Sequence, residues 1–120
     1  MMAAETAANA SIDTPTEPIP IEGRDELDDV TAEYDVVLAD FHAEWCGPCQ
    51  MLEPIVDRLA TETNASVAKI DIDENQQLAR TYGVRGVPTL ALFAEGEQVE
   101  KVVGVQSEEQ LRSLIEQYTE

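Results

Sequence analysis

Two cysteines separated by two residues carry the most specific chemistry in this sequence. Cys46 and Cys49 are the only cysteines of the 120-residue chain, and they enclose Gly47 and Pro48. A dithiol at this spacing can close into a disulfide and open again, so it can transfer two electrons by thiol–disulfide exchange. A purely structural disulfide is a weaker interpretation, because closing so short a loop removes little chain entropy.

Metal binding is the alternative chemistry for this pair of cysteines. Zinc and iron–sulfur centres usually need four ligands, and the rest of the sequence offers a single histidine, His42, and no further thiol. A metal centre would therefore have to be shared between two chains. We expect no metal and no separate cofactor, with the Cys46–Cys49 pair itself as the redox group.

The position of the pair between a strand and a helix gives the two sulfurs different roles. Residues 36–43 form a nearly continuous apolar run, which is typical of a central strand, and residues 47–63 follow with a helical pattern. Cys46 then lies at the start of the helix, where unpaired N–H groups and the helix dipole stabilise a thiolate. We expect Cys46 to be exposed and nucleophilic, and Cys49 to lie one turn further in and to resolve the mixed disulfide.

The residues between the cysteines suit this mechanism. Gly47 gives the backbone freedom to approach a substrate closely. Pro48 falls in the first helical turn, where proline is tolerated, and it keeps the two sulfurs in register.

Asp40 interrupts the apolar run of residues 36–43. A buried carboxyl is costly unless it is paired or protonated, so we expect its pKa to be raised. Since it lies behind the helix that carries Cys49, it is placed to exchange a proton with that thiol. Lys69, in a second predicted strand at residues 66–72, is its expected charge partner. The alternative is an edge position at which Asp40 is simply solvated.

The remaining patterns complete an α/β fold. The order of elements predicts a mixed β-sheet flanked by helices. Asp73 and Gln76 have the spacing of a capping box, as do Ser107 and Gln110, and each pair predicts a helix start. The other expected elements are an edge strand near residues 19–22, a helix at 25–34, a helix ending at Gly83, and strands at 89–94 and 98–104 joined by a turn at Glu95–Gly96.

The charge of the chain restricts its partners. Asp and Glu number 25 against 7 Lys and Arg, which gives a formal net charge of −18. Nucleic acid and anionic membrane surfaces repel such a chain, so we expect neither as a partner. The charge is spread along the sequence and repels itself unless salt screens it, which predicts a halophilic protein of a high-salt cytoplasm. The alternative is an ordinary, highly soluble acidic protein.

The N-terminal residues differ in composition from the rest. Residues 1–20 are rich in Ala, Thr, Glu and Pro and predict a disordered arm, which leaves residues 21–120 as one domain. The start of the chain lacks the basic and apolar regions of a secretory signal. No run approaches the roughly 18 apolar residues of a membrane span. We therefore expect a cytoplasmic protein without a membrane partner, and a monomer.

From about Asp25 to Glu120 the chain resembles the thioredoxin family. The most specific matches are the sequence WCGPC at residues 45–49 and Gly-Val-Pro-Thr at residues 86–89. The resemblance implies a thioredoxin fold in which Asp40 exchanges a proton with the resolving thiol and Pro88 is a cis proline facing the disulfide. It also implies that Val87 and Gly104 belong to the surface that binds a client. Further matches, in order and at the family's spacing, are Asp40-Phe41, Ala43-Glu44, Pro54, Lys69, Gly96 and Gly104.

Two residues near the cysteines leave alternatives open. Trp45 is interpreted as a surface aromatic that contacts clients, with a core position as the alternative. His42 departs from the family, which usually has a large aromatic ring at this position. It is either a packed, hydrogen-bonded ring or a proton carrier or cation that assists Cys46.

The leading hypothesis for function is a protein disulfide reductase. The chain has no dinucleotide-binding glycine pattern, so a separate electron donor of the thioredoxin reductase type is expected to recharge it. Its partners would be that donor and client proteins that contain disulfides. A disulfide oxidase or isomerase is the alternative enzyme, and a non-enzymatic binding module is the alternative outside enzymes. The intact pair of Cys46 and Cys49 disfavours the binding module.

Overall fold

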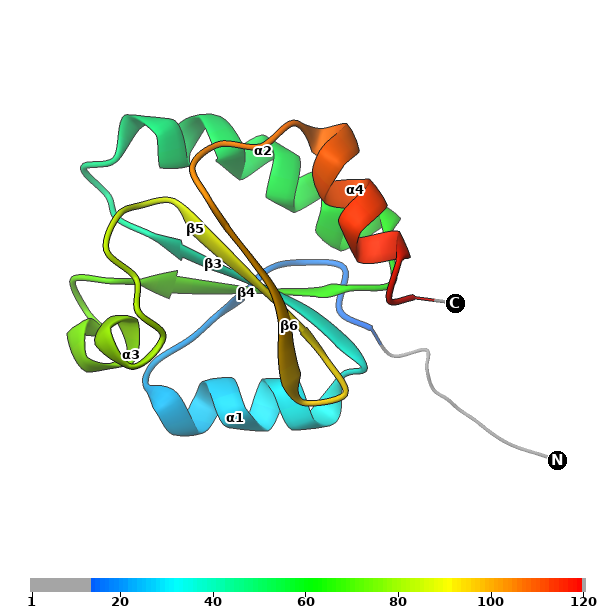
Figure 1. Cartoon of the computed structure of the whole chain (residues 1–120), viewed down its shortest axis with the longest axis horizontal. Helices are drawn as coiled ribbons and strands as arrows, with labels where there is room; N and C mark the ends of the chain where they lie inside the picture. Colours follow the sequence, from blue (N-terminus) through cyan, green and yellow to red (C-terminus); the bar gives the residue numbers. More distant parts are fainter. Residues whose placement is uncertain (1–13, 120) are drawn as a thin grey trace, which may run out of the picture.

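The computed structural model describes residues 14–119 and shows a five-stranded sheet with helices on both faces (Figure 1). Every element expected from the sequence is present and in the expected order, which confirms the α/β architecture with a mixed sheet. The elements are β2 (Ile19–Pro20), α1 (Arg24–Glu33), β3 (Val36–His42), α2 (Gly47–Glu62), β4 (Ser66–Asp71), α3 (Gln76–Thr81), β5 (Thr89–Ala94), β6 (Glu97–Val103) and α4 (Glu108–Glu116).

Strand β3 lies at the centre of the sheet. The strand order is β2-β4-β3-β5-β6, in which β2, β4 and β3 run parallel and β5 and β6 are antiparallel to their neighbours. With strands on both sides and helices on both faces, β3 has no side open to water. This explains why its sequence is a nearly continuous apolar run rather than an alternation of apolar and polar residues.

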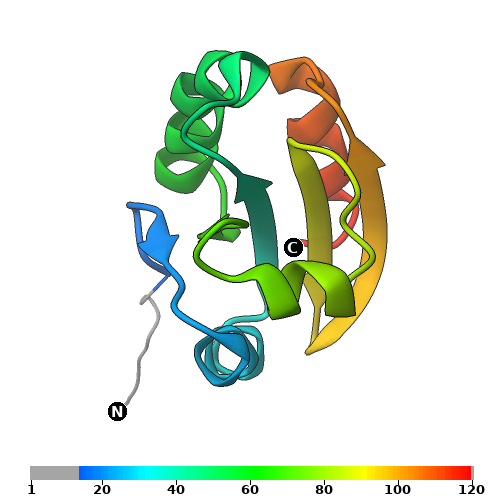
Figure 2. The same ribbon diagram turned by 90° about the vertical axis from the view of Figure 1, so that its left-hand side faces the viewer.

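Two helices cover each face of the sheet. Helices α2 and α4 lie on one face and α1 and α3 on the other, as the two views show (Figures 1 and 2). Along β3, Val36 and Leu38 pack into the core under α2 and α4, whereas Val37, Ala39 and Phe41 pack into the core under α1 and α3. Even-numbered residues of β3 therefore point toward α2, which carries Cys49.

The sheet begins with the short edge strand expected near residue 19. Ile19 and Pro20 pair in parallel with Ala68 and Lys69 of β4, and Ile21 N donates a hydrogen bond of 2.9 Å to Lys69 O. The sheet thus includes two residues before position 21, where the domain was expected to start. Most of the expected N-terminal arm, residues 1–13, lies outside the described residues.

One expected helix start is confirmed and one is wrong. Ser107 and Gln110 form the predicted capping box of α4. Asp73 and Gln76 do not cap α3, which begins after Asn75 and has no side-chain cap. The Asp73 carboxylate is instead bound to Trp45, a contact between distant segments that no local spacing encodes. No helix within residues 14–119 is long and apolar enough to cross a membrane.

Two serines allow a matched test of the packing. The Ser66 hydroxyl is fully buried and has no hydrogen-bond partner among residues 14–119, whereas Ser107 Oγ accepts a hydrogen bond of 3.1 Å from Gln110 N. We predict that Ser66→Ala raises the free energy of unfolding by about 1 kcal/mol, because it removes an unsatisfied buried group. Ser107→Ala should lower it by about 1 kcal/mol through loss of the cap. Urea unfolding at one salt concentration measures both, and a destabilised Ser66→Ala variant would contradict the first expectation.

Candidate active site

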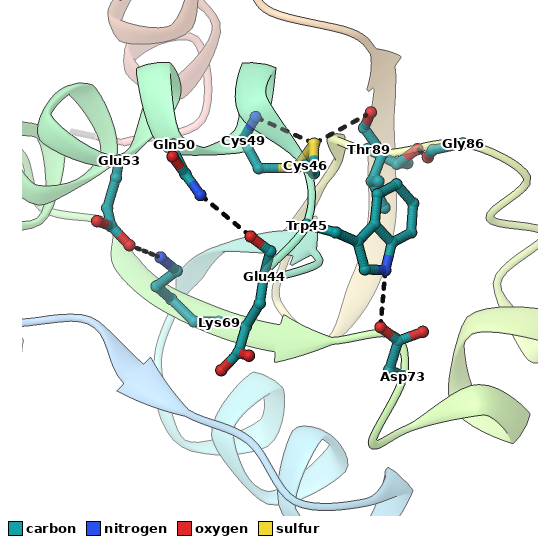
Figure 3. The surroundings of a disulfide bond; sticks show 11 residues. Glu44, Trp45, Cys46, Cys49, Gln50, Glu53, Lys69, Asp73, Gly86 and Thr89 are labelled. Atoms are coloured by element: carbon teal, nitrogen blue, oxygen red, sulfur yellow. Dashed lines mark hydrogen bonds and ion pairs between the residues drawn. A yellow bond between two sulfur atoms is a disulfide. The ribbon is translucent and has the colours of Figure 1, made fainter.

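The two cysteines form a disulfide at the start of α2 (Figure 3). Cys46 is the N-cap residue of this helix, and its Sγ accepts a hydrogen bond of 3.1 Å from Cys49 N. The predicted position of Cys46 at the helix start is thereby confirmed. When the disulfide is opened, the same N–H group and the positive end of the helix stabilise a thiolate on Cys46.

The expected difference in exposure between the two cysteines is wrong. Cys46 is 4% exposed and Cys49 is 7% exposed, so both lie largely under the surface. They form a small apolar cluster with Ala43, against which Ile72 and Val87 pack. The two sulfurs are therefore distinguished by their positions relative to the helix end and not by their contact with water.

The loop before β5 lies directly beside Cys46. The Val87–Pro88 peptide bond is cis, as the resemblance implies, and Val87 O lies 3.6 Å from Cys46 Sγ. Gly104 N donates a hydrogen bond of 2.8 Å to Pro88 O, so Gly104 belongs to the same surface region. The structure thus brings together Cys46, Val87, Pro88 and Gly104 from three distant segments.

Trp45 is a surface residue. Its side chain is 69% exposed, which rules out the core alternative, and its Nε1 donates a hydrogen bond of 2.9 Å to Asp73 Oδ2 (Figure 3). Sequence reasoning missed Asp73 as a partner of Trp45, because the two residues meet only in the folded chain. The hydrogen bond holds the exposed indole ring in place beside the disulfide.

Asp40 is buried, as expected, on the α2 side of β3. It is 2% exposed, and its Oδ1 has no hydrogen-bond partner among residues 14–119, so the solvated alternative is wrong. Burial raises the pKa of Asp40 to about 6, with Lys69 acting in the opposite direction and Glu53 adding to the rise. A carboxyl with this pKa changes its protonation state close to neutral pH.

Lys69 is not paired with Asp40, which corrects the expected ion pair. The two residues are in register on the neighbouring strands β3 and β4, yet Lys69 Nζ pairs with Glu53 Oε2 at 3.1 Å. The Glu53 side chain is 58% exposed and that of Lys69 17%, so the carboxylate of the pair keeps water contact that it would lose inside the core. Sequence reasoning missed Glu53, although its spacing of four from Cys49 places the two residues one helical turn apart.

His42 ends β3 and is half-buried. It lines a cavity of about 500 Å³ together with Cys49, Glu53 and Lys69. The half-buried position agrees with a packed ring, and no hydrogen bond joins the imidazole to another side chain within residues 14–119. Burial lowers the pKa of His42, and the nearby Lys69 ammonium lowers it further. The ring is therefore neutral at pH 7, which disfavours a cationic role toward Cys46.

The fold and the disulfide at the helix start together define a thiol–disulfide oxidoreductase. A family model described as Thioredoxin matches residues 22–117. The chain belongs to the thioredoxin family and is a protein-disulfide oxidoreductase of that family. Members of the family use a redox-active disulfide, and no group of three or more His, Cys, Asp or Glu residues that could hold a metal ion occurs within the described part of this chain.

Individual relatives agree with this assignment. The chain is 50% identical to a thioredoxin of Chlamydia pneumoniae over 84 residues, which are 69% of this chain and 82% of the relative. It is 42% identical to a thioredoxin of Staphylococcus aureus over 92 residues, 75% of this chain and 88% of the relative. Among solved structures, a mutant thioredoxin from Halobacterium salinarum is 68% identical with a TM-score of 0.88, covering 89% of this chain and 95% of that one.

The buried carboxyl of Asp40 makes stability depend on pH. Its pKa is about 6 in the folded chain against 3.8 for an ordinary Asp, so between these values only the unfolded state ionises and stability falls as pH rises. The shift corresponds to about 3 kcal/mol once both states are ionised. We predict that Asp40→Asn raises the free energy of unfolding by up to about 3 kcal/mol at pH 7.5 and far less at pH 4. Urea unfolding at the two pH values tests this, and an equal effect at both would contradict it.

Proposed function

We propose that this protein reduces disulfide bonds of other proteins, with Cys46 as the nucleophile and Cys49 as the resolving thiol. The observation that carries the proposal is the position of Cys46 Sγ. It lies at the N-cap of α2, accepts a hydrogen bond from Cys49 N and is 3.6 Å from Val87 O. The start of α2 thus activates Cys46 Sγ, and this sulfur lies next to the region where a client strand would bind.

The first step transfers the client to Cys46. In the reduced protein the Cys46 thiolate attacks one sulfur of the client disulfide, and the second client sulfur leaves as a thiolate that takes up a proton. A mixed disulfide between Cys46 and the client results. Gly47 and Pro48, the first two residues of α2, hold Cys46 at the helix start while this bond forms.

The second step releases the client and needs a base for Cys49. The Cys49 thiol gives its proton to the Asp40 carboxylate and attacks Cys46 Sγ, and the client leaves with its second reduced sulfur. Two electrons have then passed to the client, and the Cys46–Cys49 disulfide seen in the structure has formed. A pKa of about 6 suits Asp40 to this role, because the group exchanges protons near neutral pH.

The client surface proposed here comprises Trp45, Val87, Pro88 and Gly104. Trp45 is exposed and fixed by Asp73, so it offers apolar contact area at little cost in side-chain entropy. Val87 offers backbone groups to an extended client segment, which is the usual way a strand is recognised.

The Cys46–Cys49 disulfide is the only redox group that we propose for this protein. A separate electron donor therefore has to reduce it back to the dithiol after each cycle. We assign this step to a donor of the thioredoxin reductase type, which supplies two electrons in the cytoplasm. A disulfide oxidase or isomerase would use the same cysteines in the opposite direction or without net electron transfer. The Gly47–Pro48 pair between the cysteines favours the reductase.

Insulin reduction tests the reductase function. With dithiothreitol as the donor, we expect the protein to accelerate precipitation of the reduced insulin chains. Cys46→Ser should abolish this acceleration, whereas Cys49→Ser should accumulate a mixed disulfide visible by mass spectrometry. The assay is run in dilute buffer and in molar salt, with the folded state checked by circular dichroism. A folded parent protein no faster than dithiothreitol alone would overturn the proposal and favour an oxidase or a binding role.

Salt adaptation is a second property that we propose, on the basis of the net charge of −18. Repulsion among carboxylates destabilises the compact chain in dilute buffer. In molar salt the screening length falls to about 3 Å, so this repulsion is largely removed. We therefore expect the midpoint of thermal unfolding to rise with added potassium chloride up to molar concentration. Equal midpoints in dilute buffer and in molar salt would contradict the expectation.

A further inference from the structure

Beside the first turns of α2 the structure has an open surface pocket that the proposed reaction does not explain. It has a volume of about 500 Å³, and Cys49, Glu53, His42 and Lys69 contribute to its lining. In Figure 3 the Glu53–Lys69 ion pair lies on one side of the disulfide, and Trp45, part of the proposed client surface, lies on the other. The ion pair therefore adjoins the resolving thiol and not the client surface.

The pairing of Lys69 within this region is unexpected. Asp40 and Lys69 are in register on neighbouring parallel strands, so their side chains leave the same face of the sheet. Asp40 is 2% exposed and its Oδ1 is unpartnered among residues 14–119, while the Lys69 ammonium is 3.1 Å from Glu53 Oε2. Lys69, the cation in register with Asp40, is thus bound to Glu53 instead.

The charged and titratable groups on this face can be assigned element by element. Strand β3 contributes His42, whose ring is neutral at pH 7 because burial lowers its pKa. Strand β4 contributes Lys69 and Asp71, the segment between β3 and α2 contributes Glu44, and α2 contributes Glu53 and Cys49, which is held in the disulfide. On the other side of Asp40, β5 places the apolar Leu90 in register with it. In this set Lys69 is the one permanent cation, so its position decides whether Asp40 has a counterion.

We propose that Glu53 is a positioning residue for the proton acceptor of the reaction: it holds the Lys69 ammonium away from Asp40 and leaves this buried carboxyl without a counterion. The inference rests on the proposed role of Asp40 as the base for Cys49. Glu53 acts through Lys69, to which its carboxylate is bound at 3.1 Å. Without Glu53, Lys69 would be free to turn along the sheet face toward Asp40 and stabilise its ionised form.

The effect of Glu53 has two physical parts that can be separated. The negative charge of Glu53 itself raises the pKa of Asp40, and Lys69 lowers it. A direct charge effect would be the same whether or not Lys69 is present. An effect through the position of Lys69 would disappear when Lys69 is replaced by an uncharged side chain.

A double-mutant cycle on the oxidised, full-length protein measures the second part. The pKa of Asp40 is followed by the pH dependence of its ¹³Cγ chemical shift in the parent, Glu53→Gln, Lys69→Met and the double variant. We expect Glu53→Gln to shift the midpoint of Asp40 to lower pH, and to shift it distinctly less in the Lys69→Met background. Equal shifts in both backgrounds, or no shift in either, would overturn the proposal.

Three further measurements complete the experiment. Asp57→Asn removes one carboxylate from the exposed side of α2 without touching Lys69, and it should leave the midpoint of Asp40 within the error of the parent value. The pH profile of insulin reduction by Glu53→Gln should move to lower pH together with the midpoint. Asp40→Asn tests the proposed base separately: if it reduces insulin as fast as the parent, the role of Asp40 fails, whereas the midpoint shifts still decide the role of Glu53.

Discussion

The hydrogen bond from Cys49 N to Cys46 Sγ is the contact on which the site depends. It requires that β3 end at His42 and that α2 begin at Gly47, so that one sulfur caps the helix and the other lies one turn inside it. The buried strand β3 fixes the first condition, because it is held by β4 on one side and β5 on the other. The chemistry of Cys46 therefore follows from the rigidity of the sheet beneath it.

The second condition depends on how α2 is attached to the sheet and to α4. Arg58 of α2 pairs with Glu108 of α4 at 2.7 Å, and Arg112 of α4 pairs with Glu62 of α2 at 2.6 Å. Exposed ion pairs of this kind contribute little each, typically about 0–1 kcal/mol, and salt screens them. The shared apolar core, with Leu52 and Val56 of α2 fully buried, carries most of the attachment of α2 to the sheet.

The sequence predicts those features of this protein that local patterns encode. The apolar run of β3, the proline in the first turn of α2 and the capping box at Ser107 each depend on residues close in the chain, and each is confirmed. Side-chain contacts between distant segments could not be predicted in this way. Lys69 binds Glu53 and not Asp40, because the folded chain brings the Glu53 carboxylate of α2 to the Lys69 ammonium of β4, and residue spacing alone does not reveal this.

The same limit applies to Asp73 and to the cysteines themselves. Asp73 has the spacing of a helix cap, but its carboxylate accepts a hydrogen bond from the indole N–H of Trp45, 28 positions away, and does not cap the helix. Cys46 lies at the predicted helix end, yet Ile72 and Val87 cover it, and neither is near it in the sequence. In each case the local pattern identifies a side chain that can form the interaction, and tertiary contacts determine which partner that side chain has.

Asp40 shows why a costly arrangement persists in such a site. A carboxyl buried between β4 and β5 without a hydrogen bond at Oδ1 destabilises the folded chain at neutral pH, where its ionisation is opposed by burial. A close pairing with Lys69 would relieve this cost, but it would also fix the carboxyl in its ionised form and weaken it as a base. The Glu53–Lys69 pair avoids that outcome by offering the ammonium a partner at the helix surface. The instability at Asp40 and its capacity to exchange a proton near neutral pH thus have one physical cause, the absence of a bound counterion in a buried position.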